Sequence, residues 1–218
     1  MMTEDKSTQT PRWVRKLLIP ALIGGTVGFA ASSAMMRFID SDAVGGLGAS
    51  ASIAALVGVL YCVIALGILF GAARPRLGAK FLNVEDADEL LEQKKMLTLS
   101  GASMLLWGIS LLALALAAPD GPLPQTAALV IGVCGLVIGI GLSVLVYRHS
   151  DELMAAVNLE AGALSYGIVS LVVGMWAMLA HLGYAAAPAP LDLLSLLYVL
   201  VLLASFIAVG RRGMLTIR

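Results

Sequence analysis

The stretch that decides the fold is LPQTAALVIGVCGLVIGIGLSVLVY at 123–147, followed by RHSDELMAAVNLE at 148–160 and then another apolar run. The first part carries no charge and exceeds the ~20 residues that a helix needs to cross the hydrocarbon core of a bilayer. The second part places charged side chains between two such runs. This arrangement predicts two membrane-spanning helices joined by a short charged turn.

The composition extends this interpretation to the whole chain. Hydrophobic residues make up 60% of the sequence, charged residues 13%, and the mean hydropathy is +0.95. A soluble domain averages about 45–50% apolar and ~25% charged residues, so much of this surface must face lipid. The apolar runs are too long for barrel strands and do not alternate. We therefore expect an all-α integral membrane protein, a six-transmembrane-helix bundle with short loops, whose spans lie near 17–36, 49–73, 96–118, 123–147, 158–182 and 192–210.

Lysine and arginine are distributed unevenly between the expected loops. Thirteen of the fourteen fall on the side that holds both termini, and only Arg37 falls on the other. Positively charged loops stay in the cytoplasm, so we expect cytoplasmic termini and a cytoplasmic membrane of the bacterial type. The domain plan is then a disordered tail at 1–15, one transmembrane domain at 16–212 and a second tail at 213–218. As an alternative, PRWVRKLLIPALIGGTVGFAASSAM at 11–35 also fits a cleaved signal peptide, although no soluble region follows it.

Small residues at regular spacing predict where the helices pack. Lipid tails are as apolar as leucine, so membrane helices associate where small side chains let backbones approach. A pore lined by small residues is the alternative, but such stripes are common at ordinary helix contacts. The expected packing residues are Gly24, Gly28, Ser32, Gly58, Ala65, Gly135 and Gly139.

Two acidic segments share the letters DEL and stand before apolar runs: VEDADELLEQKK at 84–95 and the segment at 148–160. Asn83 and Ser150 are good helix N-caps, and acids in a first turn are stabilised by the helix dipole. Helix capping is therefore the first interpretation of both segments. The second is an acidic patch that contacts a partner, a basic ligand or a cation. Its candidate residues are Asp88, Glu89, Glu92, Asp151, Glu152, Asn158 and Glu160.

Glu160 is the most costly of these residues because it stands directly before an apolar run. A carboxylate at that depth is expected to have a partner or a path to water. The spacing of the acids matches no metal-binding loop, and His149 and His181 lie at opposite ends of a span. We expect neither a metal nor a cofactor.

Repeated letters also predict an internal duplication of a two-helix hairpin. Cys62 and Gly67 match Cys134 and Gly139 at one offset, and the two DEL motifs match at a shorter one. The two hairpins would occupy 58–116 and 130–180 and run in the same direction, related by an axis along the membrane normal.

The sequence excludes several function classes. It contains no GxxxxGK, GxSxG, HExxH or CxxC motif, and no basic patch for nucleic acid. We therefore expect a non-enzymatic accessory or scaffold protein whose acidic cytoplasmic hairpins contact a protein partner or a second copy. The alternative is a small oligomeric transporter or channel for a cation or a small neutral solute. An intramembrane enzyme is a third possibility, and it lacks a paired base and nucleophile.

Overall fold

The computed structural model describes residues 19–41, 44, 46–78 and 87–214 and is helical throughout most of that length. Six of its helices are long and apolar enough to cross a membrane. The expected all-α, multi-pass bundle is therefore confirmed. The expected tail at 1–15 and the proposed cap Asn83 lie outside the described residues. The helices are α1 (Ile19–Ile39), α2 (Ala49–Ala73), α3 (Pro75–Gly78), α4 (Ala87–Glu92), α5 (Lys94–Ala115), α6 (Gln125–His149), α7 (Glu152–His181) and α8 (Pro190–Arg211).

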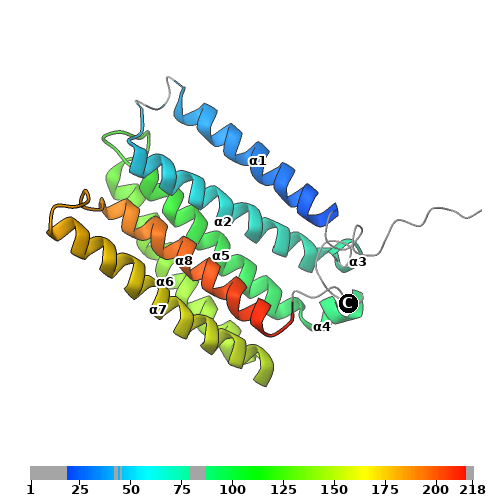
Figure 1. Cartoon of the computed structure of the whole chain (residues 1–218). Coiled ribbons are helices and arrows are strands. Elements are labelled where there is room, and N and C mark those ends of the chain that lie inside the picture. Colours follow the sequence, from blue (N-terminus) through cyan, green and yellow to red (C-terminus); the bar gives the residue numbers. More distant parts are fainter. Residues whose placement is uncertain (1–18, 42–43, 45, 79–86, 215–218) are drawn as a thin grey trace, which may run out of the picture.

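The long helices form a row with a second layer beside it. Helices α1, α2, α5 and α6 follow one another across the row, α8 packs on α2 and more lightly on α5, and α7 packs on α8 (Figure 1). Consequently α1 and α7 lie at the two edges of the bundle. In the described part of the chain, α1 contacts no other helix than α2.

The α2–α5 interface is the most extensive in the molecule, and two glycines explain why. A Cβ on Gly58 would lie 3.0 Å from the Gly108 carbonyl oxygen, and a Cβ on Gly108 would lie 2.9 Å from the Gly58 carbonyl oxygen. The two backbones are therefore in direct contact, as expected where small residues meet in lipid. Ala65, another expected packing residue, is fully buried on α2.

The α5–α6 interface uses the other two glycines that the sequence singled out. A Cβ on Gly135 would meet the Ser110 hydroxyl, and one on Gly139 would meet the Trp107 indole. The Gly139 carbonyl also accepts a hydrogen bond of 2.8 Å from Ser103, which is buried. Small residues on α6 thus admit larger side chains of α5.

Aromatic side chains attach α8 to this core. The Tyr61 hydroxyl donates to the Tyr198 carbonyl oxygen at 2.7 Å, and the Tyr198 hydroxyl donates to the Trp107 carbonyl oxygen at 3.3 Å. The Tyr61 and Tyr198 rings also pack at a centroid distance of 4.9 Å. These contacts join α2, α5 and α8 inside the bundle, where backbone and hydroxyl groups need protein partners.

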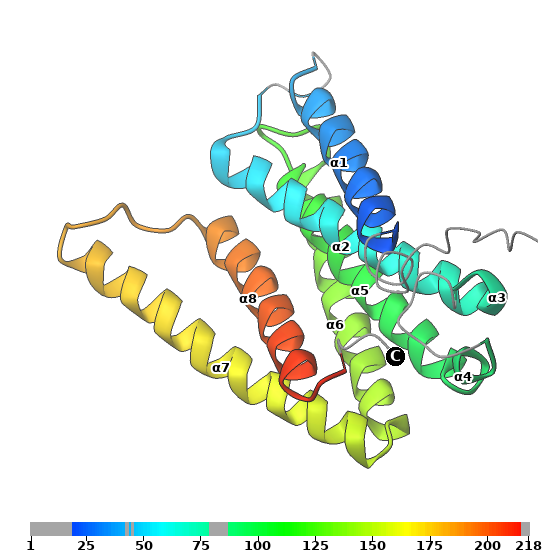
Figure 2. The same cartoon turned by 45° about the vertical axis from the view of Figure 1, so that its right-hand side comes forward.

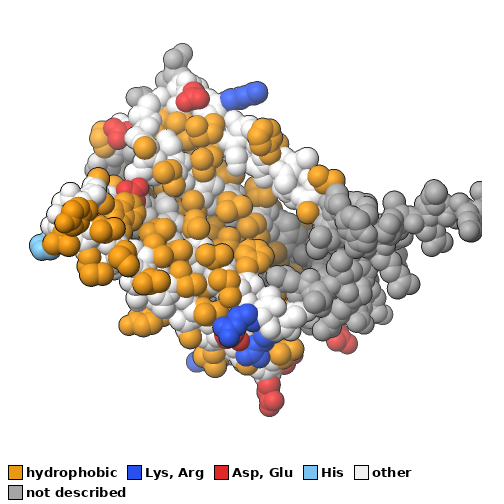
Figure 3. Space-filling view, viewed as in Figure 1, with side chains coloured by type: hydrophobic (Ala, Val, Ile, Leu, Met, Phe, Trp, Pro, Cys, Tyr) orange, Lys and Arg blue, Asp and Glu red, His pale blue; other side chains and the backbone are white. Residues whose placement is uncertain are grey.

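The outer surface is apolar between two charged ends. Phe29 on α1 is 76% exposed and Tyr166 on α7 is 79% exposed. Figure 3 shows hydrophobic side chains covering the middle of the visible face and charged side chains gathered near its ends. We call the end with the α6–α7 turn the Arg/Lys end; its described cations are Arg74, Lys94, Lys95, Arg148, Arg211 and Arg212. The other end, with the α7–α8 connection, is the opposite end.

The expected packing stripe on the first span meets no other described helix at its two glycines. A Cβ on Gly24 or Gly28 would meet nothing within 4 Å, and Ser32 is half-buried. Helix α1 contacts the core chiefly through Met35 and Ile39, near its C-terminal end. The two glycines therefore meet no described neighbour, and their role in packing stays a prediction.

The predicted common hairpin is also not found as a packed unit. Helices α2 and α5 touch along their length, whereas α6 and α7 touch only near their turn and then diverge (Figure 2). Cys62 lies against Gly108 at the α2–α5 interface, but its proposed counterpart Cys134 is exposed. The shared letters therefore do not correspond to shared packing.

Candidate functional site at the Arg/Lys end

The acidic candidates belong to two separate places at this end. Asp88 and Glu89 lie in the short helix α4, and their side chains are outside what the structure describes. Glu92 ends α4 and is exposed. Helix α4 contacts α2, α3 and α5, whereas α7 contacts α6 and α8. Helices α4 and α7, which carry the two DEL segments, therefore do not contact each other in the described structure.

Asp151 caps α7. Its Oδ1 atom accepts a hydrogen bond of 2.7 Å from the Met154 backbone N–H, which has no partner within the helix. The sequence favoured Ser150 as the cap, but the Ser150 hydroxyl instead donates to the Val146 carbonyl oxygen at the end of α6. Glu152 occupies the first turn of α7 and is exposed. The first interpretation of this segment, helix capping, accounts for Asp151.

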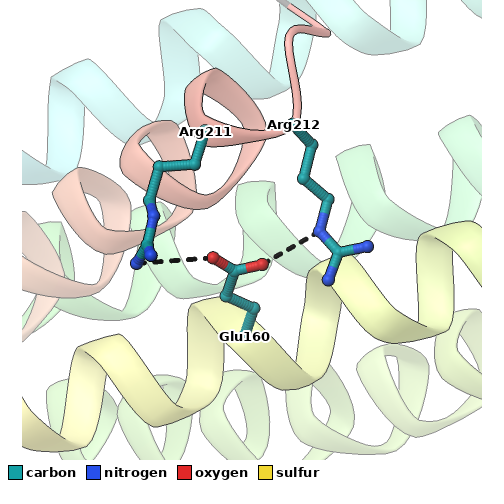
Figure 4. A network of polar contacts seen from close by, with 3 residues as sticks. All are labelled: Glu160, Arg211 and Arg212. Carbon is teal, nitrogen blue, oxygen red and sulfur yellow. Dashed lines mark hydrogen bonds and ion pairs between the residues drawn. The ribbon is translucent and has the colours of Figure 1, made fainter.

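Glu160 is paired with two arginines. Arg212 Nε donates to Glu160 Oε2 at 2.9 Å, and an Arg211 guanidinium nitrogen lies 3.5 Å from Oε1 (Figure 4). The Glu160 side chain is 24% exposed, against 33% for Arg212 and 64% for Arg211. Each carboxylate oxygen of Glu160 therefore faces one arginine.

The ion pairs have a clear structural origin. Helix α7 begins at Glu152, earlier than the expected span, so Glu160 lies inside the helix and Asn158 lies on its exposed surface. Directly beside Glu160, Val157 and Ala161 pack against Ala208 of α8. The last turn of α8 therefore brings Arg211 and Arg212 over Glu160. The sequence predicted a partner for this carboxylate but did not identify it.

A second contact at this end was missed by sequence reasoning. Lys95 Nζ lies 2.8 Å from His149 Nε2, and His149 Nδ1 lies 2.7 Å from the Leu145 carbonyl oxygen. An ammonium group only donates hydrogen bonds, so Nε2 accepts and Nδ1–H donates. The contact joins the start of α5 to the end of α6. These residues are 54 positions apart, and no spacing in the sequence links them.

These contacts limit the chemistry available at the Arg/Lys end. Asp151 is used for capping and Glu160 for ion pairing, which leaves Glu92, Glu152 and Asn158 as exposed polar candidates. Within the described residues, no three His, Cys, Asp or Glu side chains are placed to hold a metal ion. The exposed acids can still meet a basic group from outside the chain.

No protein-family model matches the chain, and no curated protein or solved structure is significantly similar to it. The packing and the charges of the molecule itself are therefore what indicate its function.

Proposed function

We propose that the protein is a non-enzymatic accessory or scaffold protein that contacts a partner within its membrane. The observation that carries the proposal is the open face of α7. This helix is 30 residues long, and among the described helices its main neighbour is α8; its buried residues, Val157 and Ala161, both lie near the Arg/Lys end. Large apolar side chains of α7 are exposed, including Leu159 at 61% and Leu171 at 64%. A second membrane helix would find a long unoccupied surface there.

The charged groups at the start of α7 support the same proposal. Glu152 and Asn158 are exposed next to this open face, while Glu160 holds the helix against α8. A basic segment of the partner would therefore meet Glu152 and Asn158 where its helix leaves the membrane. Complementary charge of this kind contributes mainly to the specificity of an interaction.

The test is capture of tagged full-length protein from its native membrane in mild detergent. We expect a stoichiometric partner with the wild type and its loss with Glu152→Lys, because the reversed charge repels a basic segment. Asp120→Lys is the matched control, since Asp120 is exposed at the opposite end and should leave capture unchanged. Capture that survives Glu152→Lys would contradict the proposed contact. Solute flux through the purified protein in liposomes, without a partner, would instead support the transporter alternative.

We further propose that the Arg/Lys end faces the cytoplasm, with both termini on that side. The asymmetry of lysine and arginine between the two ends supports this orientation. In a background with Cys62 and Cys134 replaced by alanine, single cysteines at Ser7 and Thr216 should resist a membrane-impermeant thiol reagent applied to intact cells. A cysteine in place of Asp120 should react. Labelling of either terminal position from outside would reverse the orientation.

A further inference from the structure

The two arginines that pair with Glu160 bring more positive charge than this carboxylate neutralises. Arg211 and Arg212 share one carboxylate, so the cluster of three side chains carries a net charge of +1. The only other acid within α7 is Glu152, about 12 Å away along the helix axis. The only acid within α8 is Asp192, which lies in its first turn, at the other end of the helix. The charge of the cluster is therefore not cancelled along either helix.

The two guanidinium groups also use only part of their capacity for hydrogen bonds. Each guanidinium group has five N–H donors. Within the described part of the chain, Arg212 donates only from Nε, and Arg211 makes only its 3.5 Å contact with Glu160. Figure 4 shows the two terminal nitrogens of Arg212 turned away from the carboxylate. The side chains of Arg211 and Arg212 are 64% and 33% exposed, so an acceptor from outside the chain can reach both.

The position of the cluster on α8 indicates that this acceptor comes from the membrane. Arg211 and Arg212 directly follow the apolar part of α8. Ile207 and Leu203, one and two turns before Arg211, are 36% and 47% exposed and belong to the apolar outer surface. Arginine side chains at the end of a span extend to the headgroup level, where the phosphates of the leaflet lie.

Phosphate is the headgroup component that matches two arginines. Guanidinium groups bind phosphate oxygens through paired N–H···O bonds and stay charged in proteins. The free oxygens of a phosphate are spaced much like those of a carboxylate, so one phosphate can bridge the same two cations. The C-terminal end of α8 carries a partial negative charge, so the arginine side chains alone must attract the anion. A phospholipid with one net negative charge neutralises the cluster, whereas a zwitterionic one brings a cation with its phosphate.

We propose that Arg211 and Arg212 bind the phosphate of one anionic phospholipid from the leaflet at the Arg/Lys end. The terminal nitrogens of Arg212 donate to the phosphate, the exposed guanidinium of Arg211 contacts a second phosphate oxygen, and an acyl chain lies along Ile207 and Leu203. Basic groups between membrane helices bind acidic lipid headgroups in other membrane proteins.

The test uses delipidated full-length protein in detergent, titrated with phosphatidylglycerol or phosphatidylcholine that carry identical acyl chains. Bound lipid is measured by native mass spectrometry. We expect the wild type to retain phosphatidylglycerol about tenfold better, as for a hydrogen bond between charged groups. Arg212→Gln should reduce this preference to about twofold, because the cluster then has no net charge. Glu160→Gln should raise retention of phosphatidylglycerol about threefold, because glutamine still accepts a hydrogen bond but no longer competes as an anion.

Arg148→Gln is the matched control, because Arg148 is exposed at the same end but lies on α6, and the preference should persist. Size-exclusion chromatography of each variant confirms that the protein is folded. Equal retention of both lipids by the wild type would overturn the proposal. Equal losses in Arg148→Gln and Arg212→Gln would also overturn it, since they would mean diffuse attraction to the charged end.

Two further outcomes would contradict parts of the proposed contact. Retention that is unchanged or lower in Glu160→Gln would mean that the two arginines do not bind the phosphate directly. Free glycerol phosphate, added at the same concentration as the lipid, should not displace it, because it has no acyl chain to lie along α8. Displacement would identify a soluble phosphate compound as the ligand and would overturn the assignment to a lipid.

Discussion

The α2–α5 pair and the α6–α7 pair both contain glycines at several positions, but the first pair packs closely and the second makes little contact. In the first pair, Gly58 and Gly108 face one another and bring the two backbones into contact. In the second pair, α7 carries Gly162, Gly167 and Gly174, and a Cβ on any of them would meet nothing within 4 Å. The number of glycines is therefore a poor guide to helix packing. Their register against a neighbouring helix decides the outcome.

The glycines of α6 explain why α6 and α7 make little contact. Gly135 and Gly139 face Ser110 and Trp107 of α5, so the small-residue face of α6 is already occupied. Helix α7 consequently packs on α8 through Val157 and Ala161. Position within the bundle, and not the repeated letters, determines which face of each helix is used.

The strongest test of this comparison is the change in the free energy of unfolding caused by Gly108→Ala and by Gly167→Ala. The new Cβ on Gly108 would lie 2.8 Å from Cys62 Sγ and 2.9 Å from the Gly58 carbonyl oxygen, so the helices must separate. We expect a loss of about 3 kcal/mol in the free energy of unfolding, at the upper end for overpacking. The measurement is denaturation by sodium dodecyl sulfate, followed by circular dichroism.

Gly167→Ala should raise the free energy of unfolding instead of lowering it. It adds a methyl group in open space on α7 and removes backbone freedom, which stabilises a helix by about 0.5–1 kcal/mol. Equal responses of the two variants would show that α2 and α5 are not in backbone contact.

Gly139→Ala tests whether α6 belongs to the tight core. Its Cβ would overlap the Trp107 indole, which lies against α6 and near the Tyr198 ring of α8. We expect a loss of about 2 kcal/mol and a shift in tryptophan emission, because the ring must move. Gly141→Ala is the control on the same helix, since nothing lies within 4 Å of its added Cβ. Matching stability and matching spectra for the two variants would place Trp107 elsewhere.

Glu160→Gln measures what the ion pairs contribute to holding α7. The carboxylate and both arginines are partly exposed, so solvent screening keeps the expected loss near 1 kcal/mol or less. The effect should diminish in high salt, because the Arg211 pair is the more exposed one. Glu152→Gln, at an exposed position in the same helix, should change stability by less than about 0.5 kcal/mol. A loss of several kcal/mol would mean that Glu160 is buried far more deeply than in this structure.

Tyr61→Phe should have the smallest effect. It removes the hydrogen bond to the Tyr198 carbonyl and leaves the ring packing in place. Side-chain hydrogen bonds between membrane helices average about 0.6 kcal/mol, and a loss of that size is expected here in the same denaturation assay. Tyr166→Phe is the control, because Tyr166 is exposed on α7 and should be silent. A silent Tyr61→Phe would show that the Tyr61–Tyr198 hydrogen bond does not help to hold α8 against α2.

The sequence was sufficient to predict the six membrane-spanning helices, but it did not predict which helices lie next to one another. Apolar length alone located six helices, because lipid imposes that length on every span. It could not place α8 beside α2, since each span is apolar on most of its circumference and no stripe identifies the buried side. Tyr61 and Tyr198, which join these helices, lie 137 residues apart.

The same holds for the candidate site: its local features were predicted from the sequence, but its contacts between distant helices were not. Local physics predicted a cap at the start of α7, with Ser150 favoured, and a partner or a path to water for Glu160. The structure shows Asp151 as the cap and Arg212 beside Glu160. The identity of Arg212 depended on α8 returning to the start of α7. In the sequence, Arg211 and Arg212 indicate only the orientation of the chain in the membrane.

The attachment of α7 to α8 has a consequence for the order of assembly. During synthesis α7 enters the bilayer before α8, and it touches α6 only near their shared turn. It therefore waits without a lateral neighbour until α8 has been inserted. The Glu160 contact with Arg212 can form only after the last turn of α8 has been synthesised. Residues 211 and 212 are therefore the last part of α7–α8 packing to form. A chain that stalls within α8 would leave four helices in a row and α7 free to meet another protein.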